Sequence, residues 1–174
     1  MKFKFQLSIC LLTALPNSAL AQDIGSWTLG QRTDTDGVVV HIASLDASNL
    51  ITSGSGAPDY AARYAITCRT GDTKSWTQQL ELEDAIAGSG EIEIDARIDA
   101  KSPREETWII GLKNRILTRR NTPDIAELKS AEALTLKWNW GWSWLWLSDK
   151  ARLQLGEVAA VIFTLAKNCE IPEP

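Results

Sequence analysis

The sequence predicts a mainly β protein, either an antiparallel β-sandwich or a strongly curved sheet, with a short helix near 123–132 and a packed C-terminal helix near 157–167. The main observation is an alternation of apolar and polar residues with a period of two. In residues 88–99, "GSGEIEIDARID", Ile92, Ile94 and Ile98 fall on one face and acidic residues on the other. Successive side chains of a strand point to opposite faces, so this pattern is typical of a half-buried antiparallel strand.

Further strands are expected at residues 37–45, 62–70, 75–83 and 107–114, and the Gly- and Ser-rich residues 49–60 predict a loop. In 75–83, Trp76, Leu80 and Leu82 share one face. The whole pattern predicts six to eight strands without an internal repeat or an interdomain linker.

Helical spacing is confined to two segments. The first has Thr122 as the expected N-cap and Pro123 at the first helical position. The second, residues 157–167, places four apolar residues at i, i+3, i+4 and i+7, which predicts a helix with one buried face. These residues are Val158, Val161, Ile162 and Leu165.

Residues 1–21 have the features of a signal peptide. Lys2 and Lys4 precede an apolar stretch, and Ala19 and Ala21 form the small-x-small pattern of a cleavage site. Pro16 ends the apolar run too early for a membrane span of about 20 residues. The sequence therefore predicts an exported protein of a Gram-negative-type periplasm, with a single domain at 22–174.

Cysteine usage agrees with export. Cys10 would leave with the leader, so Cys68 and Cys169 remain as an even pair in an oxidising compartment. We expect a Cys68–Cys169 disulfide that fastens the C-terminus to an early strand.

The charge balance restricts the partners. Without Lys2 and Lys4, 16 of the 18 basic residues face 22 acidic residues, so the mature chain has a net charge of −6 with histidine neutral. This charge argues against nucleic acid as a partner and against contact with an anionic membrane surface.

The sequence offers few catalytic candidates. His41 is the one histidine, and it lies inside an expected strand, where a lone histidine is most often structural. An acidic row could hold a cation or supply a glycosidase pair, but a solvated strand face is the favoured interpretation. The row consists of Glu91, Glu93, Asp95 and Asp99. We therefore expect no enzyme activity, no metal and no cofactor.

A basic segment at 113–121, "KNRILTRRN", is expected to form an exposed loop that could bind an acidic partner. Its cationic residues are Lys113, Arg115, Arg119 and Arg120.

The segment 136–147, "LKWNWGWSWLWL", is the candidate interaction surface. Its tryptophans are Trp138, Trp140, Trp142, Trp144 and Trp146. Five such rings present on the order of 1,000 Å², whereas a soluble monomer rarely exposes more than about 300–600 Å² of contiguous apolar surface. Most of the rings must therefore be covered, by the core, a sugar or a protein partner.

Two geometries fit this segment. One long strand would place all five rings on one face. A hairpin centred on Trp142 would instead pair Trp140 with Trp144 and Trp138 with Trp146, leaving Trp142 at the tip. Gly141 permits either geometry.

With these pieces in order, the chain resembles the VasI/TagO family of periplasmic proteins associated with type VI secretion. The matching pieces are Trp27 followed by "DTDGVVVHIAS", "YAITC" ending at Cys68, "IEIDARID" leading to Trp108, "IAELKSAEALTLKW", and "LQLGEVAAVIFTLAKNC". The Trp-rich insert and Leu153 depart from the family pattern. A more distant resemblance is to invasion-associated locus B proteins, which are also small, exported and β-rich.

The family resemblance implies a non-catalytic accessory protein with a protein partner in the cell envelope, and it implies no catalytic residues. The alternative is a module that binds peptidoglycan or another glycan through the Trp-rich segment.

Overall fold

The computed structural model describes residues 22–53, 57–71, 75–120, 124–140 and 147–174, and only the backbone of Gln22, Trp140 and Leu147. The expected signal peptide, Thr122, Pro123, Trp142, Trp144 and Trp146 lie outside the described residues. The elements in chain order are β1 (Gln22–Ile24), β2 (Trp27–Thr33), β3 (Val39–Asp46), β4 (Arg63–Arg69), β5 (Ser75–Glu81), β6 (Glu91–Ile98), β7 (Arg104–Ile110), η1 (Leu112–Asn114), β8 (Ile116–Arg120), α1 (Ile125–Leu128), β9 (Ala133–Trp140), β10 (Leu147–Gln154) and α2 (Val158–Cys169).

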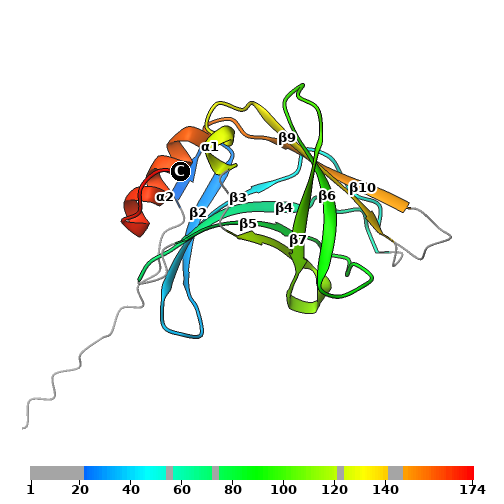
Figure 1. Cartoon of the computed structure of the whole chain (residues 1–174), viewed down its shortest axis with the longest axis horizontal. Coiled ribbons are helices and arrows are strands. Elements are labelled where there is room, and N and C mark those ends of the chain that lie inside the picture. Colours follow the sequence, from blue (N-terminus) through cyan, green and yellow to red (C-terminus); the bar gives the residue numbers. More distant parts are fainter. Residues whose placement is uncertain (1–21, 54–56, 72–74, 121–123, 141–146) are drawn as a thin grey trace, which may run out of the picture.

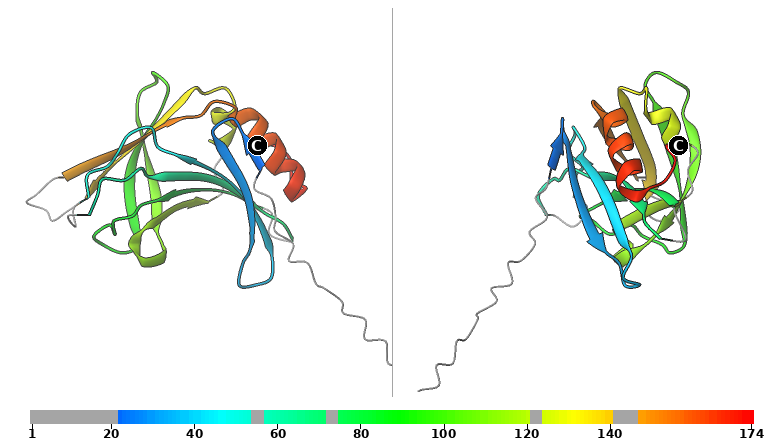
Figure 2. Two further views of the ribbon diagram at one scale, coloured as in Figure 1. Left: turned by 180° about the vertical axis from the view of Figure 1, so that it is seen from behind. Right: turned by 90° about the vertical axis from the view of Figure 1, so that its left-hand side faces the viewer.

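The strands form one antiparallel sheet, in the order β1-β2-β3-β4-β5-β8-β7-β6-β9-β10. The sheet bends so strongly that β6 and β7 run across the direction of β3–β5 (Figures 1 and 2). The mainly β fold is thus confirmed, and it takes the strongly curved form of the two that the sequence allowed. The sheet is not closed.

One face of the sheet, the inner face, lines the core. Its largest fully buried side chains include Trp27, Tyr64, Trp108 and Trp138. In β6 the predicted alternation holds, since Ile94, Ala96 and Ile98 are buried and the residues between them are exposed. The opposite, outer face carries most of the charged and hydroxylated side chains of the strands.

Both expected helices are present. The first is shorter than the segment 123–132, because α1 spans only four residues, of which Ile125 and Leu128 are buried. The second, α2, packs on β3 and β4 through the predicted apolar positions. Both helices lie at one end of the molecule, and β9 and β10 extend toward the other end (Figure 1).

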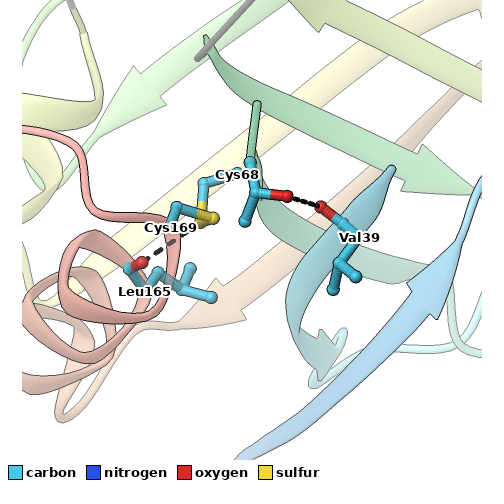
Figure 3. The surroundings of a disulfide bond; sticks show 5 residues. Val39, Cys68, Leu165 and Cys169 are labelled. Atoms are coloured by element: carbon cyan, nitrogen blue, oxygen red, sulfur yellow. Dashed lines mark hydrogen bonds between the residues drawn. A yellow bond between two sulfur atoms is a disulfide. The ribbon is translucent and has the colours of Figure 1, made fainter. Parts of the chain in front are cut away.

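The predicted disulfide joins Cys68 of β4 to Cys169 at the end of α2 (Figure 3). Both cysteines are buried, and the Sγ atom of Cys68 lies 3.2 Å from the carbonyl oxygen of Leu165. In the chain-entropy model, a bridge that closes a loop of this length contributes up to about 4.7 kcal/mol. The bridge holds α2 against the inner face of the sheet.

The segment after β3 covers part of the free edge of β10. The backbone N–H of Ser48 donates a hydrogen bond to the carbonyl of Arg152 at 2.7 Å. The side-chain amide of Asn49 donates one to the carbonyl of Lys150 at 2.9 Å. In return, the Arg152 N–H donates to the Asn49 side-chain oxygen at 2.7 Å. These bonds join the segment after β3 to the edge strand β10, and they satisfy part of an edge that would otherwise be open to aggregation.

Candidate interaction surface

A groove of about 590 Å³ follows the outer face of β6, β9 and β10. Its floor contains a row of charged residues that are register partners across the three strands: Asp95 on β6, Lys137 on β9 and Lys150 on β10. All three are exposed, since their sequence neighbours Ile94, Trp138 and Ala151 point into the core.

The row is electrostatically unbalanced. Asp95 is the register partner of Lys137 on one side, and Lys150 faces Lys137 directly from the other. Like charges at directly opposed positions of an antiparallel pair destabilise the pair, at a separation of about 4.5–5.5 Å between Cβ atoms. An acidic group placed in the groove would therefore interact favourably with both lysines.

One wall of the groove is the segment that covers the edge of β10. Ile51 anchors this segment, as its side chain is 3% exposed, whereas the neighbouring Leu50 is 64% exposed. Both residues line the groove. The groove thus combines a charged floor with an exposed apolar side chain at its rim.

The groove adjoins the Trp-rich segment, which forms a hairpin. Trp140 is the register partner of Leu147, and Trp138 is the register partner of Asp149. One of the two geometries left open, a single long strand, is therefore wrong. The pairing expected for a hairpin centred on Trp142 is also wrong, because Trp138 is paired with Asp149 and Trp140 with Leu147.

The core determines this register. In the observed pairing Ala151 and Leu153 lie opposite Leu136 and Leu134, so four apolar residues face inward together. A hairpin centred on Trp142 would have placed Ser148 and Lys150 opposite these leucines. The apolar residues beyond the tryptophans therefore decide the pairing.

The tryptophans do not share one role. Trp138 is only 2% exposed and belongs to the core. The β9–β10 pair extends beyond the neighbouring strand β6, because β6 pairs with β9 only as far as Trp138. Asn139 and Trp140 pair with β10 alone, so they belong to a two-stranded arm that leaves the sheet (Figures 1 and 2).

Apart from Asp95, which lies in the groove, the other sequence candidates lie outside it. His41 is partly buried in β3, opposite Cys68, and burial lowers its pKa. Glu91, Glu93 and Asp95 are exposed along β6, and Glu93 accepts a hydrogen bond from Thr107 at 3.0 Å. Asp99 leaves this row, because its carboxylate accepts the backbone N–H groups of residues 132 and 133. In the described part of the chain, no group of three or more histidine, cysteine or acidic side chains is placed to hold a metal ion.

The basic segment is not the exposed loop that the sequence predicted. It contains the end of η1 and all of β8, and its basic residues differ in their exposure to solvent. Lys113 and Arg115 are exposed, whereas Arg119 points inward and forms ion pairs with Glu106, at 3.2 Å, and with Asp124.

This buried cluster was missed by the sequence analysis. Glu106 is 5% exposed and accepts hydrogen bonds from Arg104 at 2.8 Å and from the Trp108 ring N–H at 3.2 Å. Nearby, Tyr64 donates to Gln78 at 2.6 Å. Burial, and then the charge of Glu106, raises the pKa of Tyr64 well above its ordinary value, so the hydroxyl remains a donor. The ion pairs of the cluster join β7, β8 and the residue that precedes α1.

The chain was compared with known proteins. No protein-family model matches it, and no curated protein sequence matches it. Among solved structures it is similar to the crystal structure of invasion-associated protein B from Bartonella henselae, with a TM-score of 0.59 and 11% sequence identity. The similarity covers 87% of this chain and 99% of that chain.

The two chains share a fold. This finding agrees with the more distant of the two sequence resemblances, the one to invasion-associated locus B proteins. Membership of the VasI/TagO family stays a prediction. No helix among the described residues is long and apolar enough to cross a membrane.

Proposed function

We propose that the protein is a non-catalytic, exported binding protein of the cell envelope, and that it docks a protein partner on the groove and the adjoining Trp-rich hairpin. The observation that carries this proposal is the position of the groove. Its charged floor lies on β9 and β10, the same two strands that form the arm with the tryptophans. The groove and the arm therefore lie on the same pair of strands, so one partner could contact both.

The composition of this surface suits a protein partner. Binding energy in protein interfaces is concentrated in a few apolar and aromatic anchors, which a polar rim surrounds. Leu50 and the tryptophans beyond Trp138 would supply anchors, and the charged groove would supply the polar contacts. Because Lys137 and Lys150 face each other, the best-matched partner segment would carry an acidic side chain.

Three findings support an envelope role. Residues 1–21 have the pattern of a signal peptide, and the predicted disulfide suits an oxidising compartment. The fold is shared with a protein described as invasion-associated. The resemblance to the VasI/TagO family makes a type VI secretion accessory the finer form of the proposal.

A second candidate is a glycan-binding module. The groove volume lies within the range of small-ligand sites, about 300–1,000 Å³, and the lining includes Thr52, Thr135 and Ser148 beside the Trp-rich hairpin. Hydroxyl groups next to aromatic rings are the chemistry that sugars need. Peptidoglycan is the glycan that a periplasmic protein meets.

Site-specific photo-crosslinking in the native cell tests the first proposal. A crosslinking residue at position 50 should trap a distinct envelope protein, and the same residue at position 112 should not. Leu112 is a matched control because it is 69% exposed, close to the 64% of Leu50, and it does not line the groove.

The same adducts at both positions, or none at position 50, would contradict the proposal. Co-sedimentation of the purified protein with peptidoglycan tests the second candidate, the glycan-binding module. Retention that is lost on Lys137→Glu would favour the glycan-binding function instead.

A further inference from the structure

A second depression, of about 520 Å³, lies elsewhere on the outer face, across β2, β3, β4, β5 and β8. Three arginines line it: Arg32 on β2, Arg69 on β4 and Arg120 on β8. It shares no lining residue with the groove on β6, β9 and β10. It is therefore a separate site.

The register places the arginines at regular intervals. Arg32 and Arg69 are both register partners of Val40, from opposite sides. Arg120 is the partner of Thr77, which in turn is the partner of Thr67. Neighbouring strands are about 4.7–4.9 Å apart, so each arginine is roughly 10 Å from the next across the sheet.

The floor is polar between Arg69 and Arg120, whereas the apolar Val40 lies between Arg32 and Arg69. Thr67, Thr77 and Gln79 line it, and Thr67 is only 4% exposed although it lies on the outer face. Hydroxyl and amide groups at these positions can donate hydrogen bonds to ligand oxygens.

The positive charge is only partly neutralised. Arg69 forms ion pairs with Asp34 at 2.8 Å and with Asp36 at 3.1 Å. Its Nε atom is buried and finds no hydrogen-bond acceptor among the described residues. Arg32 and Arg120 form no ion pair with any residue that the structure describes, so three arginines face two carboxylates in a chain whose net charge is −4.

We propose that this depression binds an elongated small molecule that carries two or more oxyanion groups, either phosphate or carboxylate. Planar guanidinium groups bind both kinds of oxyanion with paired hydrogen bonds. The spacing of about two strands between arginines favours separated charges over a single compact anion.

Isothermal titration calorimetry of the purified protein tests this site with four probes: short-chain linear polyphosphate, the linear dicarboxylate azelate, inorganic phosphate and acetate. We expect polyphosphate, azelate or both to bind more tightly than the two single anions, and the pattern identifies phosphate or carboxylate as the group preferred. Binding should weaken as salt is added, because exposed charges are screened.

Arg32→Gln and Arg120→Gln should each weaken binding by about tenfold or more, as expected for the loss of charge-assisted hydrogen bonds. Arg97→Gln is the matched control, since Arg97 is an exposed strand arginine that lines the other groove. Unchanged thermal melting would show that each variant is folded. The proposal is overturned if neither extended anion binds, if the single anions bind equally well, or if the three variants behave alike.

Discussion

Glu106 is a carboxylate enclosed in an interior filled mainly by aliphatic and aromatic side chains, and two arginines compensate its charge. Alternation alone marks a charged residue as solvent-facing, because acidic side chains are rarely buried unless paired. Arg119 comes from β8, and β8 itself was not predicted. The inward orientation of Glu106 therefore depends on a strand neighbour that the local pattern does not contain.

Replacing Glu106 with glutamine should destabilise the fold by roughly 3 kcal/mol, within the usual range for removing one partner of a buried ion pair. Arg104 and Arg119 would then keep only Asp124 and Glu127 as partners. Urea denaturation measures the change. Glu105→Gln is the control, since Glu105 is exposed on the outer face and should change stability by about 0.5 kcal/mol or less. Equal effects would contradict the assigned role of Glu106.

His41 should make stability depend on pH. Burial lowers its pKa in the folded state below the ordinary value of 6.5, so the unfolded chain binds a proton more readily. The contribution of His41 to stability is therefore complete above pH 6.5 and decreases as the pH falls toward the folded-state pKa. Denaturation above and below this value should show a larger loss for the wild type than for His41→Gln. A larger loss in the variant would contradict this assignment.

At the scale of elements, the sequence predicted strands well and their pairing poorly. The alternation at 88–99 and the helical spacing at 157–167 correspond to β6 and α2. The short β8 has no such alternation in "ILTRR", and the pairing of β5 with β8 and of β6 with β9 joins strands that are not consecutive. Such pairings depend on long-range packing, which a local pattern does not record.

The hairpin assigns a structural role to one tryptophan of the candidate surface. Trp138→Ala should destabilise the protein by about 3–5 kcal/mol, because it removes a fully buried large side chain and leaves a cavity. Phe163→Ala is the control, since Phe163 is 58% exposed on α2. Thermal or urea denaturation measures both. A change for Trp138→Ala no larger than for Phe163→Ala would place Trp138 outside the core.

For the whole molecule, composition, periodicity and cysteine usage predicted the fold class and the disulfide, but they did not predict the order of the strands. The disulfide and the single β-rich fold followed from residue types and periodicity. The groove did not, because it arises only when residues 49–52 lie against β10, about a hundred positions later in the chain. The arginine-lined depression likewise gathers residues from β2, β4 and β8, which sheet order alone brings together.

We propose that the groove on β6, β9 and β10 binds an acidic segment of an envelope partner. The most direct test uses the partner protein that is captured by crosslinking at position 50. Its dissociation constant is measured with the wild-type protein and with the Lys137→Glu and Lys113→Glu variants. Lys113 is exposed and lies outside the groove. We predict that Lys137→Glu weakens binding by about tenfold or more, since like charges across an interface are costly, while Lys113→Glu leaves it unchanged. Equal dissociation constants for all three proteins would contradict the claim.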